Sequence, residues 1–418
     1  MRMSKSRLLR LSLPLLVGAV LAACAGRPEP PGPPPGENLE RRLEGAYRPA
    51  ARSPVRGWDD EWQVAGQAVE VSWLAPEQVQ GMPLILYLPG LGESSRDGVQ
   101  WRRAWAEAGY AVLSVQPRQY GRVIYSSSEA QVGVFRSLAQ KSFADQALAA
   151  RIAVLDQVLA DLRRRAQAGE PNLARVDWQR LAVAGFDLGA QTAAALAGER
   201  AAGASAPAGW QPRAAILLSP YVAEDGGGDR FGRIGTPLLA VTGPHDEDPF
   251  GWVDPPSRRQ RLWEGVRTSG SYQLIAAEAS HRLLSGSFED MAGAGGGRQG
   301  GPSSGGRPEG GAGRGGSGGP GGGGGPGGVR QGPGGRSCRR RTRRWSRRAR
   351  AAAPGGGSRM GRGQGMEERI DPRQMASLQS LSLAFLDARV RDAAPARLWL
   401  ERDAVQWLEA TGRLERKP

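Results

Sequence analysis

The sequence predicts an α/β protein in which a mainly parallel sheet is covered by helices on both faces. Two observations support this: strand and helix signals alternate along residues 58–292, and several strand segments are apolar without interruption. A strand buried on both faces between helical layers has this composition. With residues 366–410, which carry a further helical pattern, the chain supplies roughly 280 residues, enough for one domain.

The predicted elements follow one another in a regular order. Residues 69–73 alternate apolar and polar side chains as a half-buried strand does, and residues 83–88 (Pro-Leu-Ile-Leu-Tyr-Leu) form a continuous apolar run. A long helix near residues 142–168 carries leucine and isoleucine on one face. The remaining predicted elements are helices around 97–108 and 374–390 and strands at 110–115, 181–184, 214–218, 237–242 and 272–275.

Composition excludes two kinds of protein and locates the charge. Two cysteines cannot build a disulfide scaffold, and two histidines cannot build a histidine-rich metal site. Of the formal charge of +15, residues 293–365 account for +14, with 15 arginines against Glu309. This segment also holds 31 of the 62 glycines, so it cannot bury enough apolar surface to offset the entropy of ordering. We expect a disordered Gly/Arg-rich insertion.

The N-terminus has the order of a secretory signal. Four basic residues precede an apolar run at 11–23 that is too short to span a bilayer. The run ends in Leu-Ala-Ala-Cys24, which resembles a bacterial lipobox and implies a signal peptide over residues 1–24 and an acylated Cys24. Ala25 in place of aspartate favours an outer membrane if the cell has one. An ordinary signal peptide with a chance cysteine is the alternative. We expect an extracytoplasmic, lipid-anchored protein.

Residues 25–57 contain a proline-rich stretch, Arg-Pro-Glu-Pro-Pro-Gly-Pro-Pro-Pro-Gly. Proline fixes φ and extends the backbone, so this segment is predicted to be a semi-rigid tether between the anchor and the body.

Residues 181–192 predict a strand, a tight turn and a helix. Gly185 and Gly189 flank Asp187 at two residues on either side. A nucleophile elbow needs this spacing, because the sharp turn brings the neighbouring positions too close for side chains.

Together with other turns, this elbow resembles the α/β-hydrolase superfamily, and the resemblance covers most of residues 58–292. Asp187, Asp246 and His281 then stand in the superfamily's order of nucleophile, acid and histidine. The resemblance implies an oxyanion hole from the Leu91 and Leu188 amides, and neither a metal nor a cofactor. The motifs that carry it, besides the elbow, are Pro-Gly-Leu-Gly at 89–92, Thr-Gly-Pro-His-Asp at 242–246, Ala-Ser-His at 279–281, and segments 383–387 and 399–400, which look like closing helices of the acetylhydrolase and dienelactone-hydrolase-like branch.

One departure from that branch is Asp187, where its esterases have serine. Aspartate is the nucleophile of haloalkane dehalogenases and epoxide hydrolases, where it attacks saturated carbon. Those relatives carry a helical cap, for which residues 219–235 are too short here. Many dehalogenases also place tryptophan where this chain has Leu188. Attack by Asp187 on an ester would give an unfavourable anhydride, so an ester substrate implies a water held between Asp187 and His281.

The sequence therefore leaves three functions open. The first is hydrolysis of a small ester or of a carbon–leaving-group substrate. The second is a catalytically inactive hydrolase-fold binding protein of the cell envelope. The third is an envelope tether whose active part is the arginine-rich tract. Asp248 competes with Asp246 as the acid that orients His281. The alternative for both residues is an exposed acidic turn without a catalytic role. Glu93 is expected at the mouth of the site or as a helix cap.

The arginine-rich residues 339–348 are suited to phosphate groups. For an exported chain we expect no specific nucleic acid, and contact with an anionic envelope polymer is the partner that fits best. The alternative is that this segment is a loop insertion without a function, or the product of a compensated frameshift in the gene, because either gives the same composition. The other expected partners are a small-molecule substrate and the membrane through Cys24.

Overall fold

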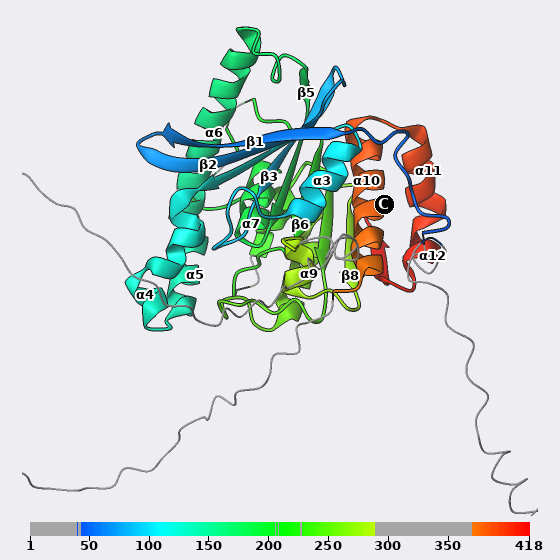
Figure 1. Ribbon diagram of the computed structural model, residues 1–418. Helices are drawn as coiled ribbons and strands as arrows, with labels where there is room; N and C mark the ends of the chain where they lie inside the picture. Colours follow the sequence, from blue (N-terminus) through cyan, green and yellow to red (C-terminus); the bar gives the residue numbers. More distant parts are fainter. Residues whose placement is uncertain (1–39, 41–42, 205, 208, 226–227, 289–369) are drawn as a thin grey trace, which may run out of the picture. The chain divides into compact units, whose positions relative to one another are not determined.

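A nine-stranded sheet organises the part of the chain that the computed structural model describes, residues 40, 43–204, 206–207, 209–225, 228–288 and 370–418. The strand order is β1-β2-β4-β3-β5-β6-β7-β8-β9 (Figure 1). The strands are β1 (Val55–Val64), β2 (Gln67–Pro76), β3 (Met82–Leu88), β4 (Ala111–Pro117), β5 (Val176–Phe186), β6 (Ala214–Leu218), β7 (Leu238–Thr242), β8 (Tyr272–Ala276) and β9 (Gly412–Arg416).

The central strands are parallel and the edges are antiparallel. Strands β4, β3, β5, β6, β7 and β8 pair in parallel, whereas β1, β2 and β9 run antiparallel to their neighbours. The predicted α/β class with a mainly parallel sheet is thereby confirmed, and the arrangement is consistent with an α/β-hydrolase-like fold.

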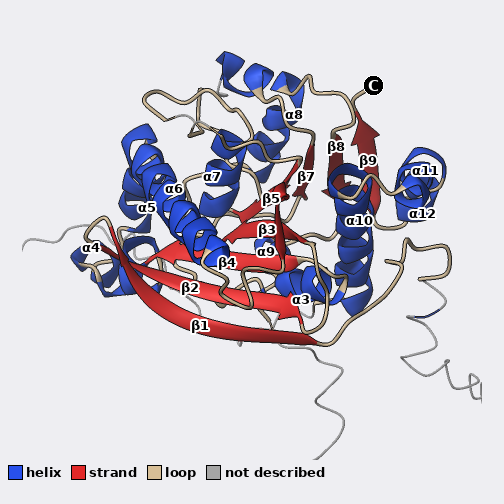
Figure 2. Cartoon of the chain, turned by 90° about the horizontal axis from the view of Figure 1, so that it is seen from above, coloured by secondary structure: helices blue, strands red, loops and turns tan. Residues whose placement is uncertain are grey.

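Helices cover both faces of this sheet (Figure 2). The α-helices are α3 (Val99–Glu107), α4 (Ser128–Gln131), α5 (Phe135–Phe143), α6 (Asp145–Gln167), α7 (Leu188–Leu196), α8 (Arg261–Gly265), α9 (His281–Ser285), α10 (Pro372–Val390), α11 (Ala394–Arg402) and α12 (Ala404–Leu408). Short 3₁₀ turns lie at η1 (Arg118–Tyr120), η2 (Arg122–Ser126), η3 (Gly228–Arg233) and η4 (Pro256–Gln260).

Strand β3 illustrates how one apolar run serves two cores. Leu84 and Leu86 pack on one face with side chains of α6 and α7, while Ile85 and Tyr87 pack on the other with α3 and α10. Successive side chains of a strand point to opposite faces, so every residue of this strand must be apolar. Burying each such leucine or isoleucine contributes about 1.5–3 kcal/mol, and the continuous run is therefore what a doubly covered strand requires.

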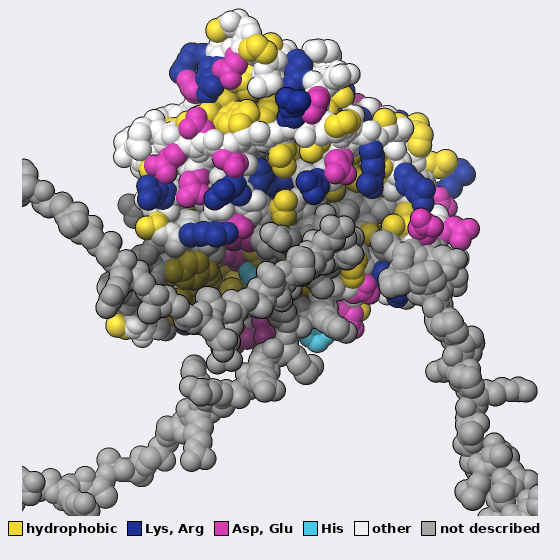
Figure 3. Space-filling view, in the orientation of Figure 1, with side chains coloured by type: hydrophobic (Ala, Val, Ile, Leu, Met, Phe, Trp, Pro, Cys, Tyr) yellow, Lys and Arg dark blue, Asp and Glu magenta, His cyan; other side chains and the backbone are white. Residues whose placement is uncertain are grey.

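Three features of the fold were not expected from the sequence. Strand β1 and strand β9 extend the sheet at its two edges. Between β4 and α6 lies a segment, residues 118–143, that contains η1, η2, α4 and α5. Five exposed large apolar side chains fall in this segment: Val123, Tyr125, Val132, Val134 and Phe135. Figure 3 shows apolar side chains gathered near α5.

Packed structure begins before residue 58, where we placed the start of the body. The Tyr47 hydroxyl donates to Asp387 at 2.7 Å, and the Trp399 indole donates to the Gly45 carbonyl at 2.8 Å. The segment before β1 is thereby fixed to α10 and α11. The predicted signal peptide with Cys24, the first part of the tether and the insertion at 293–365 lie outside the described residues. No helix among the described residues is long and apolar enough to cross a membrane.

Candidate functional site

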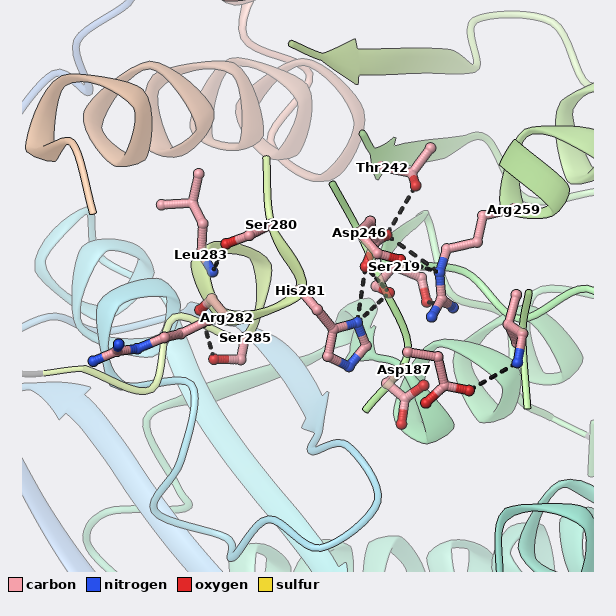
Figure 4. Close-up of polar contacts among 12 residues, drawn as sticks. Asp187, Ser219, Thr242, Asp246, Arg259, Ser280, His281, Arg282, Leu283 and Ser285 are labelled. Atoms are coloured by element: carbon pink, nitrogen blue, oxygen red, sulfur yellow. Dashed lines mark hydrogen bonds and ion pairs between the residues drawn. The ribbon is translucent and has the colours of Figure 1, made fainter. Parts of the chain in front are cut away.

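Five strands deliver residues of the candidate site to one edge of the sheet. Leu91 follows β3, Asp187 follows β5, Ser219 follows β6, Asp246 follows β7 and His281 follows β8. Because these strands are parallel, their carboxyl ends lie at the same edge, which is where ligands bind in open α/β sheets. Residues far apart in the sequence are brought together in this way, and Figure 4 shows Asp187, Asp246 and His281 near one another.

The turn that carries Asp187 is forced by close backbone contact. A Cβ on Gly189 would lie 1.8 Å from the Leu88 carbonyl oxygen, and one on Gly185 would lie 2.2 Å from the Gly189 carbonyl carbon. Asp187 itself has φ 50° and ψ −109°, a conformation that costs a residue with a side chain of order 1–3 kcal/mol. The two glycines and the strained residue between them form the sharp elbow that their spacing predicts.

The carboxyl group of Asp187 is buried and its two oxygens have different surroundings. Oδ2 accepts a hydrogen bond from the Leu91 amide at 3.3 Å. Oδ1 is buried without a hydrogen-bond partner, and the residue is only 2% exposed. Burial raises the pKa of Asp187, Asp248 raises it further, and His281, Arg259 and the Leu91 amide oppose these effects.

His281 is held on the other side by an acid and a hydroxyl. Its Nδ1 lies 2.8 Å from Oδ1 of Asp246 and 3.0 Å from Oγ of Ser219, whose hydroxyl donates to the same carboxylate oxygen at 2.7 Å. The ring also packs against Phe186 with centroids 4.6 Å apart. With Nδ1 engaged in this way, Nε2 is turned away from Asp246, and the imidazole lies between Asp246 and Asp187 (Figure 4). This orientation suits a general base acting beside Asp187.

Asp246 is fully buried and surrounded by donors. The Thr242 hydroxyl donates to its Oδ2 at 2.8 Å, and Nε of the fully buried Arg259 lies 3.3 Å from the same oxygen. Burial alone would raise the pKa of Asp246, but Arg259, His281 and Ser219 together hold it below its usual value. The surroundings of Asp246 therefore favour its ionised form, whereas burial opposes ionisation of Asp187.

Asp246 and Asp248 have different hydrogen-bond partners. Asp248 accepts three backbone hydrogen bonds at 2.8 Å, from Phe250, Trp252 and Val253. Its carboxylate thus shapes the loop after β7, while the carboxylate that reaches His281 belongs to Asp246.

The two residues assigned to the oxyanion hole lie next to Asp187. The Leu91 amide already contacts the carboxylate. Leu188 is the first residue of α7, a position where the backbone N–H has no partner within the helix. The side chains of both leucines pack in an apolar cluster with residues of η1, η2, α5 and the loop after β7: Tyr120, Ile124, Leu138, Ala139, Phe143 and Phe250. The unexpected segment 118–143 therefore forms an apolar wall beside the elbow.

Two open grooves lie away from this site. One of about 620 Å³ is lined by Trp62 and Arg165, and another of about 830 Å³ is lined by Trp178 and Arg213. Neither includes Asp187 or His281. Within the described ranges there is no group of three or more histidine, cysteine, aspartate or glutamate residues arranged to hold a metal ion.

Sequence reasoning missed three residues of the site: Ser219, Thr242 and Arg259. Ser219 directly follows a predicted strand and has φ 54°, so its position at a strand end was the available signal. Arg259 gave no signal, because nothing in the sequence distinguishes it from Arg258 and Arg261. It donates from Nη1 to the carbonyl oxygens of Ser219 and Pro220 at 3.1 and 3.3 Å, which fixes the loop after β6.

The sequence matches no protein-family model and no curated protein.

The elbow leads to a stability prediction. Gly189→Ala places a methyl group against the backbone of β3, so we expect it to destabilise the fold by about 3 kcal/mol. Gly235→Ala is the matched control, because a Cβ there meets nothing within 4 Å, and it should change stability by no more than about 0.5 kcal/mol. Chemical denaturation of both variants measures the difference. Equal free energies of unfolding for the two variants would contradict the close contact between Gly189 and Leu88.

Proposed function

We propose that this protein hydrolyses an apolar small molecule at a saturated carbon that bears a leaving group, with Asp187 as the nucleophile. The observation that carries the proposal is that the two oxygens of the Asp187 carboxylate have different surroundings. Oδ2 faces the Leu91 amide, and Oδ1 is buried and unpartnered. A carboxylate that attacks carbon needs one oxygen held by donors and the other free of them.

In the first step, Oδ1 forms a bond to the substrate carbon as the bond to the leaving group breaks. The electron pair of the broken bond departs with that group, and an ester links the substrate to Asp187. For an epoxide the leaving group is the ring oxygen of the same molecule. The unpaired state of Oδ1 favours this step, because no hydrogen bond has to be broken before attack.

In the second step, His281 Nε2 takes a proton from a water whose oxygen attacks Cγ of Asp187. Negative charge then collects on Oδ2, where the Leu91 amide, joined by the Leu188 amide, is placed to stabilise it. Collapse breaks the Cγ–Oδ1 bond and releases an alcohol, which receives the proton from His281. The second proton of the water leaves when Asp187 ionises again, and Asp246 stabilises the transient imidazolium.

An ester substrate remains the alternative within the same site. Direct attack by Asp187 would give an anhydride, so ester cleavage requires a water activated by Asp187 and His281 together. The raised pKa of Asp187 bears on both routes alike, because a nucleophilic carboxylate and a general base must each be ionised. We rank carbon–leaving-group hydrolysis first because the unpartnered Oδ1 is suited to direct attack on carbon.

The apolar cluster beside the elbow supports an uncharged, hydrophobic substrate. Leu91 and Leu188 pack with Phe143, Ile124 and Phe250, so apolar side chains border the elbow. Burial in such surroundings favours apolar groups by about 25 cal/mol per Å².

We also propose that the chain is an acylated extracytoplasmic lipoprotein of the acetylhydrolase and dienelactone-hydrolase-like branch. The signal sequence ending at Cys24 supports the anchor. The two segments that resemble closing helices fall in α10 and α11, which supports the branch. We further propose that the arginine-rich residues 339–348 contact an anionic envelope polymer.

Replacing the nucleophile tests the reaction. Asp187→Asn should lower kcat for an epoxide or haloalkane by about 10³-fold or more. Asp177→Asn, at the opposite end of β5, is the matched control and should leave kcat unchanged. A panel of epoxides, haloalkanes and short-chain esters supplies the substrates. Undiminished turnover by Asp187→Asn would refute the nucleophilic role, and ligand binding without turnover by the unaltered protein would favour a binding protein.

Isotope labelling separates the two mechanisms. In a single turnover with excess enzyme in H₂¹⁸O, a nucleophilic Asp187 gives an unlabelled alcohol and an ¹⁸O label in the peptide that contains Asp187. A water activated by Asp187 gives a labelled product and an unlabelled peptide. Mass spectrometry of the product and of the peptide that contains Asp187 measures the ¹⁸O content of each.

The anchor is tested in a bacterial host. The full-length protein should partition into the detergent phase and carry the mass of a lipid on Cys24, because two or more acyl chains give stable membrane attachment. Cys24→Ser should abolish both properties, and Cys338→Ser should leave them intact. Detergent partitioning of the Cys24→Ser chain equal to that of the unaltered chain would rule out the lipobox assignment.

A further inference from the structure

Glu93 is a half-buried acid two residues beyond the Leu91 amide, and the proposed reaction does not use it. Its Oε2 accepts a hydrogen bond from the Gly90 amide at 2.8 Å, and its Oε1 accepts one from the Ser287 hydroxyl at 2.8 Å. Both oxygens of the carboxylate are thus engaged by donors close to the site.

The first of these bonds fixes the peptide that precedes Leu91. The other side of the same loop is held by Gln116, whose side-chain amide donates to the carbonyls of Gly90 and Glu93 at 2.9 and 3.0 Å. A Cβ on Gly90 would lie 2.7 Å from the Phe186 ring, so the loop is pressed against the residue before the elbow. The direction of the Leu91 N–H toward Asp187 depends on this peptide staying in place.

The second bond joins the loop to the segment that carries His281. Ser287 lies two residues beyond the end of α9, the helix that begins at His281. The Ser287 hydroxyl oxygen also accepts from the Gly98 amide at 2.8 Å. Glu93 therefore connects the two loops that supply the oxyanion donor and the base.

We propose that ionised Glu93 is a positioning residue that holds the Leu91 amide against Asp187 and ties this loop to the His281 segment, so that protonation of Glu93 loosens the site. Its effect on turnover rests on the proposed function, whereas its effect on the loop does not.

Several charged or titratable groups face Glu93. Burial raises its pKa to about 7, the Gly90 amide, Ser287 and His281 act in the opposite direction, and Asp97 raises it further. Asp97 is itself paired with Arg122 at 3.1 Å. The phenol groups of Tyr87 and Tyr125 face the same carboxylate.

The sign of this shift predicts a cost to folding. The folded protein binds the Glu93 proton more tightly than the unfolded chain does, so stability falls as the pH rises from the ordinary carboxyl range to about 7. Above this range the ionised carboxylate lowers the stability of the folded protein.

The full-length Glu93→Gln variant tests the proposal, because glutamine mimics the protonated acid in shape and hydrogen bonding. At pH 8.5 we expect the exchange protection of backbone amides 88–98 to fall about tenfold, since hydrogen bonds to a charged acceptor are roughly twice as strong. We expect Tm to rise by about 2–4 °C at pH 8.5 and to match the unaltered protein at pH 5.5. With a substrate in hand, kcat should fall about tenfold with little change in KM.

Glu70→Gln is the matched control, because Glu70 accepts from the Ser95 amide at 3.3 Å without touching Gly90, so this variant should lower protection at Ser95 alone. Hydrogen exchange followed by mass spectrometry, and thermal melts at both pH values, read the outcome. Unchanged loop protection in Glu93→Gln, or a loss of Tm that is equal at both pH values, would overturn the proposal. If the unaltered protein turns over no substrate, the proposed function fails, and the exchange measurement still decides the role of Glu93.

Discussion

The contact between the first turn of α7 and the end of β3 is the constraint on which the site depends. Gly189 touches the Leu88 carbonyl so closely that no side chain fits, and this contact holds Asp187 in a strained conformation. The same contact fixes the distance from Asp187 to the Leu91 amide, because Leu91 follows β3 by three residues. Backbone packing, and not side-chain complementarity, therefore sets the geometry of the carboxylate.

The pKa values of two aspartates in one site are shifted in opposite directions by their surroundings. Asp246 has a buried arginine, two hydroxyl groups and an imidazole around it, so its charge is compensated. Asp187 has one amide and a buried, unpartnered oxygen. Environments that separate the pKa values of paired carboxyl groups are typical of acid and base assignments in enzymes. Arg259, which no sequence pattern pointed to, supplies much of the difference because its charge lies against Asp246.

The extent to which the fold could be predicted follows from how each element is buried. Strand β3 is apolar throughout because both of its faces are covered, so its composition identified it. Strand β1 and strand β9 lie at the edges and carry mostly polar side chains, which are indistinguishable from loop sequence. The order of Asp187, Asp246 and His281 after successive strands was readable, but the choice between Asp246 and Asp248 needed coordinates. The choice depended on hydrogen bonding, because backbone amides of the loop bind the Asp248 carboxylate and the Asp246 carboxylate is the one that contacts His281.

The sheet and its second helical layer are completed by residues near the C-terminal end of the chain. Helix α10 packs on the same face as α3, Asp387 anchors Tyr47, and β9 pairs with β8. A growing polypeptide that stops short of Arg416 consequently leaves β8 as an open edge and one core without its cover. The core beneath α10 therefore closes only when residues 370–416 join the strands that precede them in the chain.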